Sequence, residues 1–107
     1  MADFRTKQND TKPIWTHLQD VNGNVNLTNA SSVVFNMRDL DEVVKVSRGV
    51  CTIVTATTGY VKYPFQATDT DTNGFFKGEF EVTWSDGVIE TYPENGYIDI
   101  EITDDIA

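Results

Sequence analysis

The sequence has 107 residues and a net charge of −9, which is enough chain for one domain with a modest hydrophobic core. β-Branched residues dominate, with 12 Val, 7 Ile and 14 Thr against 5 Ala and 3 Leu, and this balance favours strands because branched side chains lose rotamer freedom in a helix. The acidic charge argues against nucleic acid and anionic membrane as partners, since both attract basic surfaces.

Alternation of apolar and polar residues with a period of two marks the expected strands of the first half. Residues 14–19 and 33–38 alternate in this way, which predicts strands with one buried face. Residues 49–56 carry apolar side chains on both alternations, so we expect this strand to be buried on both sides, within the fold or against a partner. The alternation of residues 61–65 predicts the next strand. Residues 40–44 fit one helical turn, a pattern too short to predict a helix.

A hairpin is the clearest element of the second half. Between residues 76 and 84, apolar residues and a glycine alternate with Lys, Glu and Thr. The Asp86-Gly87 pair that follows predicts a two-residue turn, which would place Trp84 opposite Ile89. In the last expected strand, residues 98–102, three isoleucines point one way and two acidic residues the other.

These short strands and the frequent Asn-Gly and Asp-Gly turns predict an all-β fold, an immunoglobulin-like antiparallel β-sandwich of about seven to nine short strands. We expect residues 1–107 to form a single domain whose core runs from about residue 4 to 103. The first residues show neither a signal peptide nor an apolar stretch that could span a membrane, so we expect a chain made and used in solution.

Charge is unevenly distributed along the sequence. Residues 1–77 hold all eight Lys and Arg and eight acidic residues, whereas residues 78–107 hold nine acidic residues and no Lys or Arg. We expect the acidic strands from Glu79 to Glu101 to meet a basic protein surface, and Arg38, Lys45 and Arg48 to meet a second copy. The alternative that the negative face serves solubility alone stays open. The expected interface residues are Glu79, Glu81, Glu90, Asp99, Glu101, Trp15, Arg38 and Arg48.

The sequence offers little for catalysis. His17 and Cys51, the single residues of their types, lie 34 positions apart. Cys51 falls in a mostly apolar strand, where a thiol behaves as a small hydrophobe, and nothing near it would activate a thiolate. Acidic pairs two residues apart share a solvated strand face, where carboxylates keep ordinary pKa values. We therefore expect no catalytic residue, no enzyme activity and no cofactor.

One segment resembles the start of a calcium-binding loop. Oxygen-bearing side chains at alternate positions precede Gly74, but the twelfth position is Phe80 where such loops place Glu. The weak metal candidates are Asp69, Asp71 and Asn73.

The same segment also fits the corner that precedes the penultimate strand of an immunoglobulin-like domain. Phe76 occupies the position of the corner tyrosine without its hydroxyl, and Gly78 occupies the position of the second cysteine. We favour this structural interpretation over a metal site.

Exposed aromatic residues are the remaining binding candidates. Trp15 with His17, or Tyr60 with Tyr92, would suit sugar stacking. We favour a protein interface, where Trp and Tyr are enriched.

Several blocks of the sequence, in this order and spacing, resemble phage proteins related to the N-terminal domain of the upper baseplate protein. The blocks lie between about residues 7 and 102 and are Lys7-Gln8-Asn9-Asp10-Thr11, Leu18-Gln19-Asp20-Val21-Asn22-Gly23, Val25-Asn26-Leu27-Thr28-Asn29-Ala30, Phe35-Asn36-Met37-Arg38, Gly59-Tyr60-Val61-Lys62-Tyr63, Ala67-Thr68-Asp69-Thr70-Asp71-Thr72-Asn73-Gly74, Phe80-Glu81-Val82-Thr83 and Glu90-Thr91-Tyr92-Pro93-Glu94-Asn95-Gly96-Tyr97-Ile98.

The resemblance implies an immunoglobulin-like module that docks onto other virion proteins, in many copies per particle. In the family this domain attaches to the tail core and precedes a longer region that carries receptor-binding proteins. The sequence has no heptads and no second domain, so we expect the docking role without the fibre-holding one. A tail or baseplate subunit is the leading expectation, made in the host cytoplasm and found in the virion. The alternatives are a head decoration or neck subunit and, in another class, an adhesin-like module that binds carbohydrate or depends on calcium.

Overall fold

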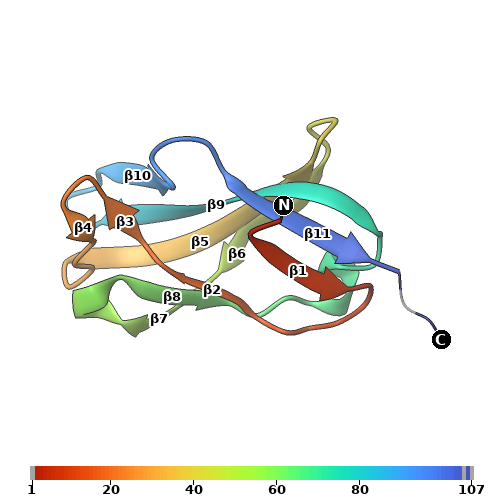
Figure 1. Cartoon of the computed structure of the whole chain (residues 1–107). Helices are drawn as coiled ribbons and strands as arrows, with labels where there is room; N and C mark the ends of the chain where they lie inside the picture. Colours follow the sequence, from red (N-terminus) through yellow and green to blue (C-terminus); the bar gives the residue numbers. More distant parts are fainter. Residues whose placement is uncertain (1, 105, 107) are drawn as a thin grey trace.

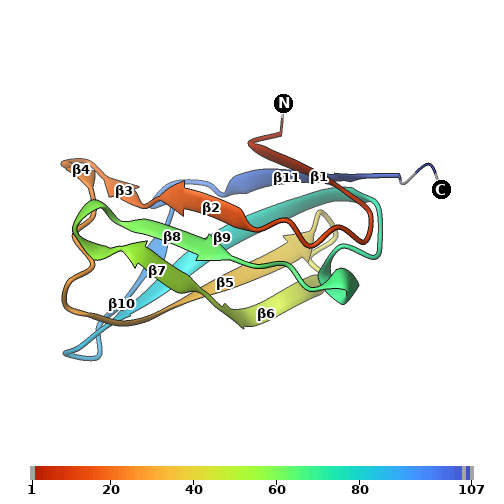
Figure 2. The same ribbon diagram turned by 90° about the horizontal axis from the view of Figure 1, so that it is seen from below.

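Two β-sheets pack face to face in the computed structural model, which describes residues 2–104 and residue 106 (Figures 1 and 2). The larger sheet has the order β1-β11-β9-β5-β6, with β10 paired to the second half of β9 beyond the end of β11. Its strands are β1 (Phe4–Lys7), β5 (Ala30–Asp39), β6 (Val44–Val50), β9 (Gly74–Trp84), β10 (Ile89–Tyr92) and β11 (Ile98–Thr103). The smaller sheet has the order β2-β8-β7, formed by β2 (Ile14–His17), β7 (Thr52–Thr55) and β8 (Tyr60–Tyr63).

Short elements complete the sandwich. Two strands of two residues each, β3 (Gln19–Asp20) and β4 (Gly23–Asn24), pair as a small hairpin. Single 3-10 turns occupy Ala56–Thr58 (η1) and Ala67–Asp69 (η2). The described residues thus hold nine strands of four or more residues and one minimal hairpin.

The strand order confirms the predicted all-β sandwich of immunoglobulin-like type. β2, β8 and β7 take the places of the B, E and D strands, and β11, β9 and β5 those of G, F and C. One pair departs from the expected antiparallel pattern, because β1 runs parallel to β11, with Phe4 opposite Ile100. The first strand therefore forms one edge of the larger sheet.

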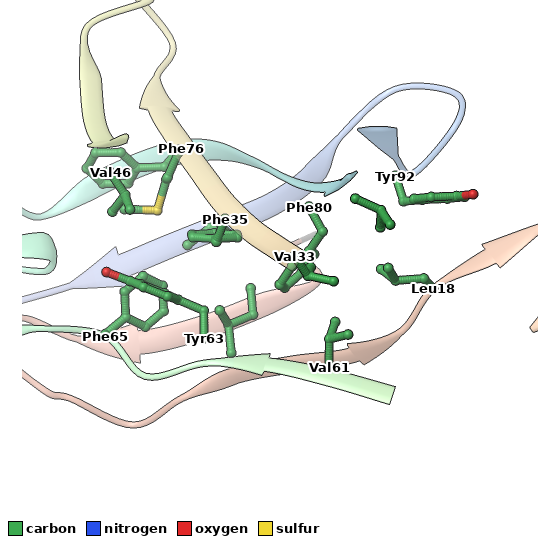
Figure 3. Packing of buried hydrophobic residues seen from close by; sticks show 14 of the residues in the cluster. Leu18, Val33, Phe35, Val46, Val61, Tyr63, Phe65, Phe76, Phe80 and Tyr92 are labelled. Atoms are coloured by element: carbon green, nitrogen blue, oxygen red, sulfur yellow. The ribbon is translucent and has the colours of Figure 1, made fainter. Parts of the chain in front are cut away.

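Aromatic rings from both sheets form the centre of the core (Figure 3). Phe35 of β5 lies 5.1 Å from Phe80 of β9 and 5.1 Å from Tyr63 of β8, measured between ring centroids. The alternation predicted for residues 76–84 and 98–102 is confirmed: Phe76, Phe80, Val82, Ile100 and Ile102 are buried, and Trp84 and Ile98 pack against the core partly buried. The remaining apolar residues of the core are Ile14, Leu18, Val25, Leu27, Val33, Met37, Val46, Val61, Phe65 and Tyr92.

The turn between β9 and β10 is one residue longer than predicted. Trp84 donates its backbone N–H to Val88 over 2.8 Å, and Gly87 donates to Trp84 over 2.9 Å. Gly87 has a φ of 90°, the left-handed conformation that follows a type I turn in three-residue hairpin loops. The predicted pairing of Trp84 with Ile89 is therefore wrong: Ile89 lies opposite Thr83, on the outer face.

Residues 49–56 are not buried on both sides within the fold. The chain leaves the larger sheet after Val50 and enters the smaller one at Thr52. Cys51 and Ile53 pack against the core, while Val50 is 80% exposed and Val54 44% exposed. The apolar residues on the second alternation thus point outward, and their contact with a partner stays a prediction.

Candidate functional site

Four of the predicted interface carboxylates share the outer face of the larger sheet. Glu79 and Glu81 lie on β9 and alternate with its buried residues, and Asp99 and Glu101 do the same on β11. Glu90 belongs elsewhere, because it lies opposite the core residue Val82 and accepts a hydrogen bond from Nε1 of Trp84 over 2.7 Å. The acidic strands therefore supply a face of four carboxylates.

Arginines of the same chain already bind part of this acidic face. Arg48 of β6 pairs with Glu81 over 2.9 Å, and Arg5 of β1 pairs with Glu101 over 2.8 Å. The charge split along the sequence is thus partly cancelled in space, because sheet pairing brings strands of the first half beside the acidic ones. Exposed ion pairs of this kind contribute little stability.

A β-bulge directs Arg48 to this position. The register between β5 and β6 shifts after Phe35, and Arg48 takes a φ of 54°. The side-chain oxygen of Asn36 accepts the N–H of Arg48 over 2.8 Å, so the donor released by the bulge is satisfied. Bulges of this kind redirect side chains and bend an edge strand.

Arg38 does not reach the acidic strands. It pairs with Glu42 over 2.8 Å, and Glu42 also binds the ammonium group of Lys77. The hydrogen bond from Lys77 holds the pKa of Glu42 below its ordinary value, and Arg38 adds to this effect. This triad ties the turn between β5 and β6 to β9.

The outer face of the smaller sheet has a different chemistry. Trp15 is 57% exposed and meets the ring of Tyr60 edge-on at 5.7 Å, while the His17 imidazole stacks on Tyr60 at 4.8 Å. Lys62 lies opposite Trp15, and strands β2, β7 and β8 contain no Asp or Glu. The pair of Trp15 and His17 proposed from sequence is thus completed by Tyr60. Tyr92 is not part of it, because Tyr92 is buried in the core.

The environments of Cys51 and His17 do not prepare either for nucleophilic chemistry. Burial raises the pKa of the Cys51 thiol to about 12, which disfavours the reactive thiolate. The thiol packs against the core and lies 3.6 Å from the carbonyl oxygen of Gly49, whereas His17 stacks on the outer face. The structure does not bring them together as a pair.

The three weak metal candidates are each engaged in separate protein contacts. Asp69 is buried and accepts hydrogen bonds from the Tyr63 hydroxyl over 2.5 Å and from the N–H of Gln66 over 2.8 Å. Asp71 pairs with Lys45, whose hydrogen bond lowers the Asp71 pKa. Asn73 donates to Asp104. Within residues 2–104 and 106, no group of three or more His, Cys, Asp or Glu is arranged to hold a metal ion.

These contacts show how the corner before β9 is fixed without the usual tyrosine. Phe76 is buried at the position where that tyrosine would lie, and the hydroxyl comes instead from Tyr63 on the opposite sheet. Thr70 adds a bond from its hydroxyl to the carbonyl of Asp10 over 2.8 Å. The structural interpretation of this segment therefore explains its polar residues.

Sequence reasoning missed a group of exposed apolar residues at one end of the larger sheet. Leu40, Val43, Val44 and Phe75 are 58–62% exposed, and Tyr97 is 46% exposed. The one signal in the sequence was Phe75, which breaks the alternation of residues 76–84. Leu40, Val43 and Tyr97 lie in a turn and a loop, where sequence periodicity carries no information, and Val44 begins β6.

No protein-family model matches this chain, and no curated protein sequence matches it either. Among the described residues, no helix is long and apolar enough to cross a membrane.

Proposed function

We propose that this chain is a non-enzymatic docking module of a phage particle, in the tail or baseplate. One observation carries the docking role. Large apolar side chains, among them Leu40 and Phe75, are exposed on the strands and turns of a strongly charged chain. Contiguous apolar patches on the surface of a soluble domain mark sites of interaction. The resemblance to the upper baseplate family supports the placement in a virion.

Mass spectrometry of purified particles tests this function. We expect the chain in stoichiometric amounts with the tail proteins, at a constant ratio across preparations. Particles that never contain it would refute the proposal. A ratio that follows the capsid protein instead would favour the alternative of a head decoration or neck subunit.

A second candidate function rests on the aromatic cluster of Trp15, Tyr60 and His17. An exposed aromatic ring beside polar side chains suits stacking against a sugar. In this alternative the module would be adhesin-like, and glycans would raise its melting temperature. Trp15→Ala would abolish that rise, whereas an unchanged melting temperature across a glycan panel would exclude the sugar-binding function. If the module instead depends on calcium, calcium ions should raise its melting temperature, and an unchanged melting temperature would exclude that form of the alternative.

A further inference from the structure

The exposed apolar residues at the end of the larger sheet form one continuous surface, which we call the hairpin patch. Its members are Leu40, Val43, Val44, Phe75 and Tyr97. Leu40, Phe75 and Tyr97 line a hollow of about 460 Å³. Leu40 and Phe75 also line a second hollow of about 380 Å³ together with the two valines. Buried Phe76 also borders both hollows, and the two exposed residues that they share, Leu40 and Phe75, form a ridge between them.

The turn between β5 and β6, which presents the Leu40 side of this ridge, is held by its own hydrogen bonds. Oδ1 of Asp39 accepts the N–H of Asp41 over 2.8 Å and that of Val43 over 2.9 Å. The N–H of Glu42 bonds to the carbonyl of Asp39 over 3.1 Å, and the Glu42 carboxylate is fixed by Arg38 and Lys77. A preorganised apolar surface loses little conformational entropy on binding, so the turn is suited to be a docking element.

The charges around the patch indicate the chemistry of its partner. The two hollows are lined by the carboxylates of Asp39, Asp41, Asp99 and Glu101 and by only two basic side chains, Arg5 and Lys45. Both basic groups are already paired, with Glu101 and Asp71. Among the described residues, no Lys or Arg forms an ion pair with Asp39, Asp41 or Asp99. The rim of the patch is therefore negative.

We infer that the hairpin patch is the docking site for a segment of a different protein, with apolar side chains at its centre and Lys or Arg at its edges. Complementary charge selects such a partner. A second copy joined by a two-fold axis through the patch would set negative rim against negative rim, which is unfavourable. This inference rests on the proposed function and names the surface through which the chain joins its particle.

Quantitative mass spectrometry of particles that carry the chain as wild type or variant tests the inference. In Leu40→Ser/Phe75→Ser the ridge becomes polar, and we expect incorporation to fall about tenfold or more because buried apolar anchors dominate interface energies. The matched control is Val88→Ser/Ile89→Ser, which changes two apolar residues of similar exposure in the turn after β9 and at the start of β10 and should leave incorporation unchanged. Melting temperatures of the free variants report whether each has folded.

Charge reversal tests the basic rim of the partner separately. Asp41→Lys should lower incorporation, whereas Glu94→Lys, an equal change in the loop after β10, should not. Wild-type levels of the Leu40→Ser/Phe75→Ser variant would overturn the hairpin patch while leaving the proposed function standing. If purified particles never contain the wild-type chain, both the hairpin patch and the proposed function are refuted. A stable dimer of the free chain that dissociates in the same double variant would show a second copy as the occupant and refute the heterologous partner.

Discussion

Removing one hydroxyl group tests how the corner before β9 is held in place. Tyr63→Phe keeps the ring that stacks on Phe35 and removes only the hydroxyl that donates to Asp69 over 2.5 Å. The Asp69 carboxylate, 9% exposed, then retains the N–H of Gln66 but loses its bond from the other sheet. Because hydrogen bonds to buried charged groups contribute about 1.5–3 kcal/mol, we expect a loss of about 2 kcal/mol in unfolding free energy. For a domain of this size that is a drop of about 8 °C in melting temperature.

Urea and thermal unfolding followed by circular dichroism measure this loss. The control is Tyr60→Phe, because the hydroxyl of Tyr60 makes no hydrogen bond within the described residues; this variant should stay within about 0.5 kcal/mol of wild type. A double-mutant cycle with Asp69→Ala isolates the pairwise energy from the other bonds of the carboxylate. If Tyr63→Phe and Tyr60→Phe unfold at the same temperature, the hydroxyl does not hold the corner and the reasoning fails.

Three further predictions concern the core. Gly78→Ala should cost about 1–3 kcal/mol by overpacking, because its Cβ would lie 2.7 Å from Cδ1 of Ile100 and 3.0 Å from the Phe35 ring. A urea midpoint equal to that of wild type would contradict this. Burial raises the pKa of the Cys51 thiol to about 12. At about pH 8 we therefore expect iodoacetamide to alkylate Cys51 about a thousandfold more slowly in the folded than in the unfolded chain. Equal alkylation rates would show an accessible thiol. Burial also raises the pKa of Tyr63 and Tyr92. Stability should therefore be complete below the ordinary pKa values of 9.0 for Cys and 10.0 for Tyr. It should fall as pH rises from these values toward the raised values of the folded protein, about 12 for Cys51 and Tyr92, which urea midpoints measured across this window would check.

The strands of the second half were predictable because one alternation fixes both their extent and their buried face. On β9 and β11 most residues expected inside are buried, including Phe80 and Ile100, and Trp84 and Ile98 pack against the core partly buried. Gly78 is also understandable from the structure. It lies where some immunoglobulin domains carry a cysteine, and Phe35 and Ile100 occupy the space beside it. The core of this sandwich is thus filled by aromatic and aliphatic packing at the position where a disulfide would lie.

The features that could not be predicted depend on backbone geometry. The β9–β10 register depends on whether Gly87 ends a two-residue or a three-residue loop, and both suit the same Asp-Gly pair. The bulge at Arg48 has no signature in the sequence, yet it decides that Arg48 meets Glu81. The hairpin patch combines Leu40, Phe75 and Tyr97, which are far apart in the sequence and meet only through strand pairing.

The proposed docking site lies at the end of the acidic strands, whereas the interface expected from the sequence includes their middle. Glu81 is bound by Arg48, whereas Asp41 and Asp99, beside the apolar ridge, pair with no Lys or Arg of the described chain. Glu79→Gln/Glu81→Gln should therefore leave incorporation into particles near the wild-type level, although it removes two charges. Asp41→Lys/Asp99→Lys should lower incorporation, because it places basic groups beside the proposed basic rim. Quantitative mass spectrometry of the two particle preparations compares them directly. The opposite ranking would place the interface on the central acidic strands, as the charge of the sequence alone suggests, and would exclude the hairpin patch as the main contact.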